Sequence, residues 1–353
     1  MITAIRWKNS SYCVYGNFIR RKFFDDSVTL VLHSSFDRIN SDIVLQIQNW
    51  NASVSLSIVL RPLNEMPLKA AANCIIAKFS EFPPSLLSFL SIHLILPVPS
   101  NKTCPILSDI QPYCSIQNTT TSSPSESLER SQPYPANTAR NVGRYFIKSK
   151  FIIIADMDHY FSKNFEIKVR ELAEKVIKNS PKTVLVYRIF EISTKVKRQD
   201  ALTKVELKQL LQNRYAREFH SSFGHGHRIP FLKEWLTSIE NYGIQFYSNY
   251  TTSEWEPQFV STNDIPMHDE TFFYPCKDNT VLRWEMCRAD YNFAIMNDLF
   301  MYHKGIKPLR TKLLLDQARY SIRGKAYSAL IKFKQRMKKV YPNTIDKCPS
   351  FKI

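Results

Sequence analysis

The sequence predicts an α/β fold built on a mostly parallel central sheet. Apolar runs of strand length alternate with segments whose apolar residues have helical spacing, which is the pattern of βαβ units. The strand-like runs are apolar at nearly every position, as expected when helices cover both faces of a parallel sheet. The chain has 353 residues, of which 44% are hydrophobic, so one large core is feasible and global disorder is excluded.

The alternation starts in the first hundred residues. Strands are expected at residues 27–33, 54–60 and 90–96, because each is a short apolar run. Helices are expected between them at residues 37–50 and 68–79, where apolar residues recur every three or four positions. This part of the sequence therefore predicts consecutive βαβ units.

Residues 100–132 interrupt the alternation. They are rich in Ser, Thr and Pro and show no apolar period, which predicts a surface loop. A linker between two domains is the alternative, but the alternation resumes directly afterwards. We therefore expect an N-terminal segment at residues 1–26, one α/β domain at 27–307 that contains the loop, and a basic helical segment at 308–353.

The second half of the domain continues the pattern. Thr203 and Glu206 have the spacing of a capping box, which predicts that a helix begins there. A further apolar strand is expected at residues 293–301. The remaining elements are expected as a helix at 137–148, a strand at 151–155, a helix at 163–179 and a strand at 183–192.

The strand at residues 151–155 leads into the strongest candidate site. Asp156 and Asp158 follow it, and the alternation of side chains places both carboxylates on one side. Open parallel sheets bind ligands beyond the carboxyl ends of their strands. Paired carboxylates there suit a divalent cation, which in turn can hold the diphosphate of a nucleotide. A chance pair of aspartates is the alternative interpretation.

A second group of candidates lies in residues 255–307. Asp269 and Glu270 are adjacent acids in a loop-like stretch, and a carboxylate beside a sugar hydroxyl is the usual general base for displacement at an anomeric carbon. A solvated acid pair is the alternative. His303 follows the strand at 293–301 and could complete a metal site with the two aspartates. A purely structural histidine is the alternative there.

The charge of the chain is concentrated near its C-terminus. Lys and Arg outnumber Asp and Glu by 48 to 31, and residues 304–339 carry +11 of the net +17. Such an excess favours an anionic partner, and a solvated helical face is the alternative. We expect one surface helix that attracts acidic acceptors. The apolar residues expected to dock it are Leu309, Leu313, Leu315, Ile322, Leu330, Ile331 and Phe333.

The cysteines and sequons bear on the compartment. Seven cysteines include no CxxC pair, so zinc ribbons and thioredoxin-like sites have no support, and at least one cysteine is unpaired. The longest apolar stretch, residues 85–98, is too short for a membrane span, so we expect any targeting segment or membrane anchor to lie outside this sequence. Sequons that favour the secretory lumen stand at Asn9, Asn51, Asn101, Asn118 and Asn249.

Seven short motifs together resemble glycosyltransferase family 49, which includes β-1,4-glucuronyltransferase and the C-terminal domain of LARGE-type enzymes. Each motif alone is weak, but they follow one another in the family's order from about residue 27 to residue 307. The chain is thus similar to a divergent member. The motifs are FDRI at 36–39, YPANTARN at 134–141, FIIIADMD at 151–158, GHR at 226–228, WEP at 255–257, the acid pair at 269–270 and MYHKG at 301–305.

The resemblance implies a GT-A type, Rossmann-like fold that binds a nucleotide sugar. It also implies an inverting transferase that uses Mn²⁺ or another divalent metal and a UDP-sugar, with glucuronate as the favoured sugar. The expected acceptor is a glycan or glycoprotein in the Golgi lumen of the secretory pathway. No nucleic acid partner is expected.

The resemblance also assigns site residues by position. Asp156 and Asp158 match the metal-binding pair, and His303 matches the third protein ligand. Arg140 is expected to contact the phosphate or carboxylate of the donor, which Asp156 also helps to hold through the metal. Asp269 is expected to be the catalytic base, ahead of Glu270.

One segment departs from the family pattern. Where the family has a Gly-Tyr-Gly turn and then Asn-Lys, this chain has Tyr274, Pro275 and Cys276, followed by Asp278 and Asn279. A proline and two side chains cannot reproduce the close backbone approach that glycines allow, so we expect altered donor or acceptor geometry. The alternatives to an active enzyme are a catalytically impaired family member and a non-catalytic basic module that binds acidic glycan or nucleic acid.

Overall fold

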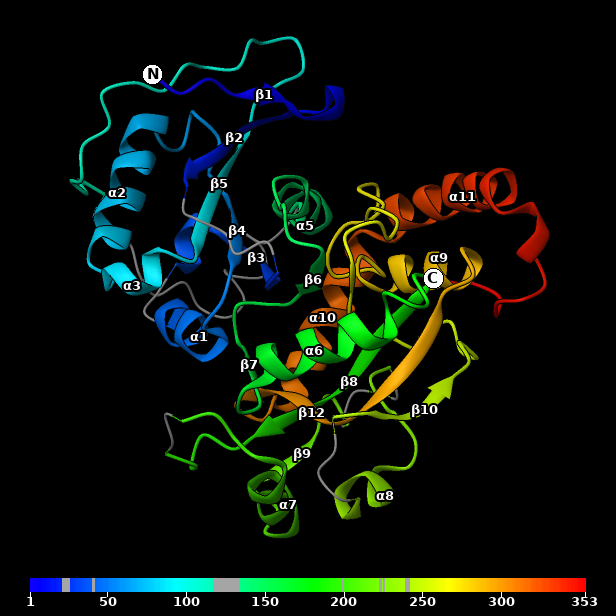
Figure 1. The fold of residues 1–353 in the computed structure, drawn as a ribbon. Helices are drawn as coiled ribbons and strands as arrows, with labels where there is room; N and C mark the ends of the chain where they lie inside the picture. Colours follow the sequence, from blue (N-terminus) through cyan, green and yellow to red (C-terminus); the bar gives the residue numbers. More distant parts are fainter. Residues whose placement is uncertain are drawn as a thin grey trace.

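The structure is a computed structural model of the chain. It describes residues 1–20, 26–39, 42–116, 134–197, 200–221, 224, 226–238 and 242–353. Within them a single 12-stranded sheet runs through the molecule, with helices packed against its faces (Figure 1). Part of the loop expected at 100–132, including the sequon at Asn118, lies outside the described residues.

Four neighbouring strands form the parallel core of the sheet. Their residues are almost all buried, because helices cover both faces, and this burial explains why the strands are mostly apolar. Buried polar residues also occur in them, among them Ser55 and Ser57 of β4 and His93 of β5. The predicted α/β class with a parallel core is therefore confirmed. In spatial order the strands are β5 (Leu90–Pro97), β4 (Val54–Val59), β3 (Val28–Ser35) and β6 (Phe151–Ile154).

The connections between these strands are helical, as their apolar spacing predicted. The helix expected at residues 37–50 is preceded by a 3-10 turn, η2 (Phe36–Arg38), so the α-helix begins at Asp42. The other predicted helices lie within a few residues of their expected positions. The connecting helices are α1 (Asp42–Trp50), α2 (Leu68–Ser80), α3 (Pro84–Leu87) and α5 (Ala136–Tyr145).

Beyond β6 the sheet becomes mixed. β11 lies between β6 and β8 and is antiparallel to both, whereas β8 and β12 are parallel to each other. The sequence did not predict β11, because its residues QFVST form neither a continuous apolar run nor a regular alternation. The strands of this half are β7 (His159–Phe161), β8 (Thr183–Ile192), β9 (Ala216–Glu218), β10 (Ile244–Ser248), β11 (Gln258–Thr262) and β12 (Asn292–Lys304).

The helices of this half cover both faces of β8 and β12. The capping box predicted at Thr203 and Glu206 is confirmed, since each residue's side chain accepts a hydrogen bond from the other's backbone N–H. The strand expected at 293–301 is longer than predicted and has a register shift at Asp298, where φ is 68°. The helices are α6 (Phe165–Val176), α7 (Lys204–Gln212), α8 (Leu232–Thr237) and α9 (Thr280–Arg288).

The sheet begins further towards the N-terminus than expected. Residues 1–26 were assigned to a separate segment, but they contain β1 (Ile5–Arg6) and β2 (Tyr12–Ile19), and β2 pairs antiparallel with β5. β2 is buried at five of its eight positions, and its pairing with β5 joins it to the domain. Its alternation of polar and apolar residues is irregular, which is why the sequence did not reveal it.

All seven cysteines lie within the described residues, and one is unpaired as predicted. Cys276 is the free thiol and is buried. The disulfides are Cys13–Cys104, Cys74–Cys114 and Cys287–Cys348. Disulfides of this number are typical of proteins that fold in an oxidising compartment, which supports the secretory pathway.

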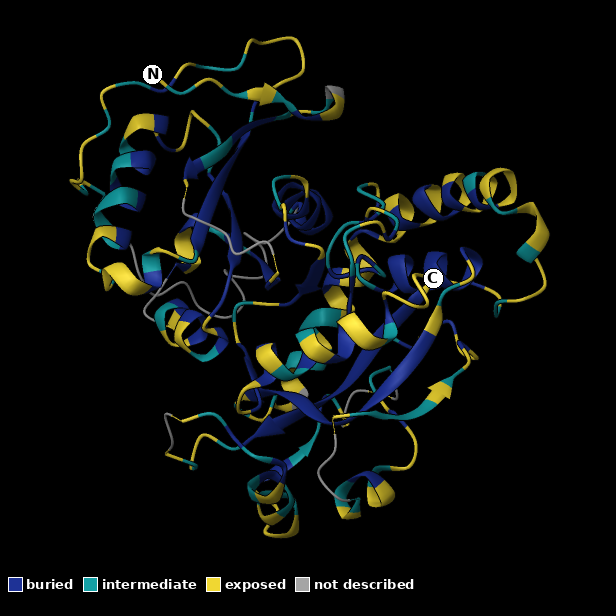
Figure 2. Ribbon diagram, viewed as in Figure 1, coloured by how far each residue is buried: buried dark blue, intermediate teal, exposed yellow. Residues whose placement is uncertain are grey.

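The basic C-terminal segment forms two helices, α10 (Leu309–Ser321) and α11 (Arg323–Val340), and the expectation of one helix was wrong. α11 buries one face, as Figure 2 shows. Leu313 and Ile331, expected to dock, are 65% and 45% exposed, because they lie on faces of the helices that turn away from the core. No described helix has the length and apolarity that a membrane span requires.

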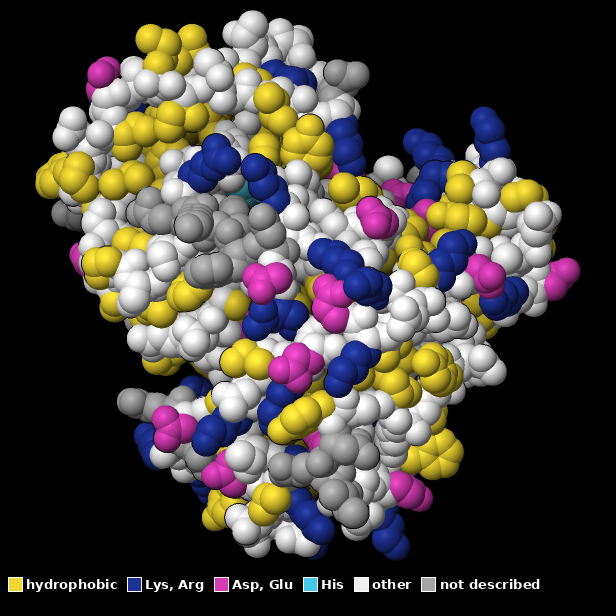
Figure 3. All heavy atoms as spheres, in the orientation of Figure 1, with side chains coloured by type: hydrophobic (Ala, Val, Ile, Leu, Met, Phe, Trp, Pro, Cys, Tyr) yellow, Lys and Arg dark blue, Asp and Glu magenta, His cyan; other side chains and the backbone are white. Residues whose placement is uncertain are grey.

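Positive charge on the surface is interspersed with acids. On the face shown in Figure 3, Lys and Arg side chains gather where α11 lies, and Asp and Glu side chains stand between other basic groups. Lys334, Lys338 and Lys339 of α11 are exposed. The concentration of basic residues predicted from the sequence is therefore present on the surface of α11.

Candidate functional site

The two predicted metal-ligating aspartates lie in the turn between β6 and β7. β6 is buried at all four of its positions, and the chain then leaves the sheet, so that the side chains of Asp156 and Asp158 are 54% and 55% exposed. Ligand atoms of these two aspartates and of His159 lie within 4.8 Å of one another. The end of the buried strand thus presents a compact group of acids, as the sequence predicted.

The pairing of β7 with β12 brings His303 to the same place. His303 lies opposite His159 in the antiparallel register. Its Nε2 is 2.9 Å from Oδ2 of Asp158. The register shift at Asp298 bends β12, so that one strand pairs with β10 along its first part and with β7 at its end.

The hydrogen bonds of His303 define which of its nitrogens can bind a cation. Nδ1 lies 2.7 Å from the carbonyl oxygen of Gly305, and a carbonyl only accepts, so Nδ1 carries the proton. In the neutral ring Nε2 then has a lone pair directed at Asp158. A lone pair and a carboxylate oxygen 2.9 Å apart repel unless a proton or a cation lies between them. Two carboxylates and one imidazole are ligands that Mn²⁺ accepts.

His159 is a site residue that the sequence analysis missed. The backbone N–H of Asp156 donates to Nδ1 of His159 at 3.3 Å, so the neutral ring carries its proton on Nε2, which faces Oδ1 of Asp158 at 3.7 Å. Burial lowers the pKa of His159, against the opposing charges of Asp158 and Asp156. A ring in this tautomer orients a carboxylate and does not bind metal. Its position directly after Asp158 was the available signal.

Both aspartates are ionised at neutral pH. Burial raises the pKa of Asp156, but His159, Arg140 and His33 together hold it below its usual value. For Asp158 burial also raises the pKa, and a hydrogen bond from Nε2 of His303 when that nitrogen is protonated, together with nearby positive charge, brings the pKa well below the usual range. The site therefore presents two carboxylates that are ready to bind a cation.

Arg140 on α5 lies beside the aspartates. Its Nη2 is 3.9 Å from Oδ1 of Asp156, and its Nη1 donates to Asn137 at 2.9 Å and to Asp278 at 2.8 Å. The guanidinium is buried, so its position is fixed. Nη1 of the guanidinium is used within the protein, and Nη2 faces Asp156.

Asp278 is a second residue whose place the sequence did not predict. It lies in the segment that departs from the family pattern, and its carboxylate is buried against Arg140. Burial raises the pKa of Asp278, and the charge of Arg140 opposes this rise. The only sequence signal was its occurrence where the family has an asparagine.

The rest of that segment rests on the C-terminal helices. The peptide bond between Tyr274 and Pro275 is cis. Arg319 of α10 donates to the carbonyl oxygen of Pro275 at 3.3 Å, and Cys276 packs with Ile322 in a small apolar cluster. The departure from the family pattern therefore coincides with support from α10 and α11.

Asp269 and Glu270 lie in the loop that precedes this segment. Oδ1 of Asp269 accepts from the backbone N–H and the hydroxyl of Thr271 at 3.0 and 2.6 Å, and Oδ2 accepts from Arg336 at 3.2 Å. Glu270 is held more firmly, by donors from four side chains. They are Trp7, Lys8, Thr138 and Asn141.

The described residues contain no direct hydrogen bond or ion pair between this acid pair and the two aspartates. The connection is indirect. Asn137 of α5 donates to the carbonyl oxygen of Asp269 at 2.8 Å and accepts from Arg140, which in turn faces Asp156. α5 therefore links the two groups of acids.

Comparison with known proteins gives matches over most of the chain. The family described as "Glycosyl-transferase for dystroglycan" matches residues 27–342. Beta-1,4-glucuronyltransferase 1 of Mus musculus is 23% identical over 352 residues, which cover 96% of this chain and 82% of the relative. The Danio rerio protein of the same name is 23% identical over 327 residues, or 85% and 73% of the two chains.

Among solved structures, the chain is similar to GalNAc-T7 with UDP, GalNAc and Mn²⁺. The identity is 8% and the TM-score 0.43, and the match covers 90% of this chain and 57% of that one.

Proposed function

The chain belongs to glycosyltransferase family 49, and we propose that it is a metal-dependent, inverting transferase that moves glucuronate from UDP-glucuronate to a glycan or glycoprotein acceptor. Two distant relatives named as glucuronyltransferases support the choice of sugar. The disulfides support a lumenal site of action, and we extend this to the Golgi. The acceptor class follows from the family.

The observation that carries the proposal is the meeting of His303 and Asp158. Nε2 of the histidine and Oδ2 of the aspartate lie 2.9 Å apart although one comes from β12 and the other from the turn after β6, and the bond from Nδ1 to Gly305 leaves Nε2 free to act as a ligand. With Asp156 they form a donor set that fits Mn²⁺. When bound, the cation would neutralise the diphosphate of the donor and of the departing UDP.

Arg140 is proposed to contact the donor. Its free edge faces Asp156, so an anionic group held at the aspartates would lie beside a fixed guanidinium. Such a group is either a phosphate of the donor or the carboxylate of glucuronate, and both accept paired hydrogen bonds from arginine. The buried bonds of Arg140 to Asn137 and Asp278 hold it in place for this contact.

Asp269 is proposed as the base, ahead of Glu270. The base takes the proton of the acceptor hydroxyl as the hydroxyl oxygen bonds to the anomeric carbon and the bond to UDP breaks. Glu270 has donors from four side chains on its two oxygens, whereas among the described residues Asp269 has side-chain donors from Thr271 and Arg336 only. Asp269 therefore has fewer side-chain donors to give up on taking a proton, although its side chain is 13% exposed against 21% for Glu270.

A catalytically impaired transferase is the second candidate. Both oxygens of Asp269 already accept hydrogen bonds, and a base must give up such bonds to take a proton. The altered segment at Tyr274, Pro275 and Cys276 adds to this candidate. It predicts metal-dependent binding of donor without turnover.

A donor screen tests both candidates. Thermal unfolding is measured with UDP-glucuronate, UDP-glucose and UDP-N-acetylgalactosamine, each with and without Mn²⁺, and the release of UDP is followed in the same samples. We expect the largest stabilisation by UDP-glucuronate, and only with metal, since a ligand bound to the native state raises its stability. Equal stabilisation without metal contradicts the proposed metal site. Metal-dependent binding with no release of UDP, even after acceptor is added, favours the impaired candidate.

A further inference from the structure

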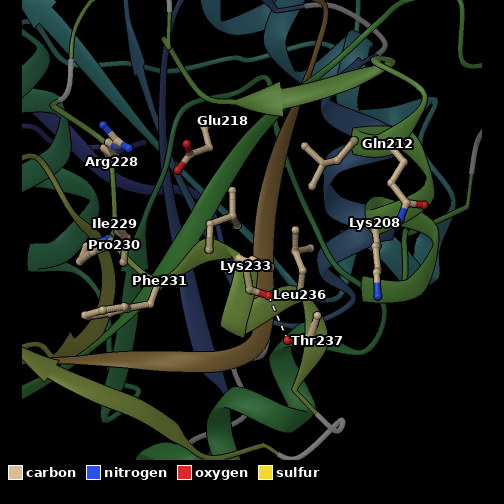
Figure 4. Close-up of a pocket in the computed structure, with 12 residues that line it drawn as sticks. Lys208, Gln212, Glu218, Arg228, Ile229, Pro230, Phe231, Lys233, Leu236 and Thr237 are labelled. Atoms are coloured by element: carbon tan, nitrogen blue, oxygen red, sulfur yellow. Dashed lines mark hydrogen bonds between the residues drawn. The ribbon is translucent and has the colours of Figure 1, made fainter.

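A cavity of about 540 Å³ lies between α7, β9 and α8 (Figure 4). Pockets of a few hundred to a thousand Å³ are typical of sites for small molecules and sugars. Lys208 comes from α7 and Glu218 from β9. Phe231 is the residue before α8, and Lys233 lies in the first turn of α8. Leu211 and Leu236 contribute apolar surface between these polar groups. The cavity thus combines an apolar wall with a charged rim.

The cavity is on the opposite face of the sheet from the candidate metal site. Glu218 of β9 lies opposite Phe190 of β8, which lies opposite Tyr302 of β12. The next residues of β8 and β12, Glu191 and His303, lie opposite each other in the adjacent row. Successive residues of a strand point to opposite faces, so Glu218 points away from the face that carries His303. A ligand in the cavity would therefore be distinct from the donor and from the metal.

Among the described residues, the charges at the rim form no direct ion pair, although burial lowers the pKa of Arg188 and the nearby charge of Glu218 opposes this lowering. Lys208, Arg228 and Lys233 line the cavity together with Glu218, and in the part of the chain that the structure describes none of these four side chains forms an ion pair or a side-chain hydrogen bond. In Figure 4, Arg228 and Glu218 lie on one side of the cavity and Lys208 on the other. Three cations against one acid favour an anionic ligand.

Phe231 is held in an unusual conformation, in which its ring makes a T-shaped contact with Phe246 of β10, with centroids 5.1 Å apart, and stays partly exposed at the cavity. Its φ and ψ are 62° and 36°, a left-handed conformation that is an outlier for a bulky residue, and 55% of the residue is exposed. Gln245 donates to its carbonyl oxygen, and the buried Arg188 donates to the carbonyl oxygens of Ile229 and Pro230. Backbone strain of this kind concentrates at ligand-binding positions.

We propose that this cavity binds an acidic oligosaccharide, at a site separate from the catalytic centre. The apolar C–H face of a sugar ring packs on an exposed aromatic ring such as Phe231. Sugar carboxylates pair with Lys208, Arg228 and Lys233, and Glu218 accepts from sugar hydroxyls. The choice of a glycan rests on the proposed function, because the acceptor or the glucuronate-bearing product would then be the ligand. The cavity would hold a distant part of the same chain that the catalytic centre extends.

The test is calorimetric titration with a hexasaccharide of alternating glucuronate and N-acetylglucosamine, with neutral chitohexaose as the control ligand. The variants are Phe231→Asn, since Asn tolerates the left-handed backbone, and the pair Lys208→Ala with Lys233→Ala. Matched controls are Tyr247→Ala, an exposed ring on β10 that is 63% exposed, and Lys175→Ala on α6. Thermal unfolding of every variant verifies that it is folded.

We expect the acidic hexasaccharide to bind and chitohexaose not to bind. Phe231→Asn should weaken binding about five- to thirtyfold, the effect of removing an aromatic hot spot, and the lysine pair should weaken it more at low salt than at high salt. Equal affinity in wild type, variants and controls overturns the proposal. So does binding of an acidic hexapeptide at the cavity in preference to the glycan.

The same variants separate this inference from the proposed function. Release of UDP from UDP-glucuronate with Mn²⁺ does not involve the cavity, so Phe231→Asn should leave it unchanged. Intact release of UDP together with unaltered affinity for the acidic glycan means that only the inference fails. If wild type shows no metal-dependent release of UDP, the proposed function fails. Binding of the hexasaccharide to wild type and variants then still tests the cavity.

Discussion

Arg336 of α11 donates to the carboxylate of Asp269, with Nη2 3.2 Å from Oδ2. The same guanidinium forms two bonds of 2.7 Å with Glu285 of α9, whose side chain is only 3% exposed. The C-terminal helix is thus tied to the loop that carries the proposed base. One of the twelve basic residues at 304–339 is used inside the fold, and it is unsuitable for tests of surface charge.

Replacement of Asp158 should abolish metal-dependent binding of UDP. Asp158→Asn removes one negative charge and leaves a donor set too poor to hold Mn²⁺ against water, so the affinity for UDP with Mn²⁺ should fall more than about tenfold, at least the loss seen when a supporting residue is changed. Calorimetry measures it. Asp316→Asn, an exposed acid on α10, is the control. An unchanged affinity in Asp158→Asn contradicts the metal assignment.

His159 should act through Asp158 and not as a ligand. His159→Phe keeps a flat ring in the same space but removes both nitrogen contacts, and the loss of a residue that orients a metal ligand lowers metal affinity about 10- to 100-fold. His303→Phe, which removes a ligand itself, should weaken Mn²⁺ binding more. Titration with Mn²⁺ compares the two. Equal losses would mean that both rings bind the metal directly.

Asp269→Asn should abolish transfer and leave donor binding nearly intact. The amide keeps the shape but cannot take the proton of the acceptor, so kcat falls while the affinity for UDP-glucuronate with Mn²⁺ stays close to that of wild type. Glu270→Gln is the matched variant and should keep activity. If Glu270→Gln is inactive and Asp269→Asn active, the two roles are reversed.

The surface of α11 should attract acidic acceptors over a distance. Charge reversal at Lys334, Lys338 and Lys339 should lower kcat/KM for an acidic acceptor and leave kcat nearly unchanged. The effect should shrink with salt, because exposed charges are screened beyond about 8 Å at physiological ionic strength. Charge reversal at Lys69, Lys175 and Lys178, which are exposed elsewhere, is the control. The same kcat/KM and the same salt dependence in both triple variants would show that α11 is only a solvated face.

His93 should make the protein less stable in mild acid. It is fully buried, its Nδ1 accepts from the backbone N–H of Asn17 at 2.9 Å, and burial lowers its pKa to about 3. The unfolded chain binds the proton near pH 6.5, so this contribution to stability is complete above pH 6.5 and is lost by about 1.4 kcal/mol per pH unit as the pH falls towards 3.

Urea unfolding at pH 6.5 and 5.5 measures this slope. Glutamine cannot take a proton in this pH range. The loss of unfolding free energy from pH 6.5 to 5.5 should therefore be about 1 kcal/mol smaller in His93→Gln than in wild type. The comparison uses the difference between pH values, so a lower overall stability of the variant does not affect it. The same slope in both proteins would show that His93 does not titrate with unfolding.

The sequence predicted those features that depend on local pattern. The strands β3, β4, β5 and β6 are recognisable because strands buried on both faces are rich in apolar residues, and the aspartates are recognisable because they follow such a strand. The expectation of a GT-A type fold came from the motifs in their family order. The basic segment was recognisable from composition, but the break at Ile322 between its two helices was not.

The features that the sequence did not predict depend on contacts between distant segments. His159 gains its role from an accepted backbone bond and from the register with His303. Asp278 gains its role from Arg140 on another element. Phe231 is one more aromatic residue in the sequence, and only its left-handed backbone and exposure distinguish it.

The disulfides divide the covalent topology of the chain into two halves. Cys13–Cys104 and Cys74–Cys114 both close before residue 117, and Cys287–Cys348 closes far beyond residue 133. No disulfide joins the first half to the second. The halves are therefore held in place by noncovalent contacts, such as the pairing of β3 with β6 and the packing of α5 on β3 and β4. Each half can complete its oxidation with cysteines of its own. The second half has a third cysteine, the free Cys276, which could form a wrong disulfide with Cys287 or Cys348 during folding. The first half contains no unpaired cysteine.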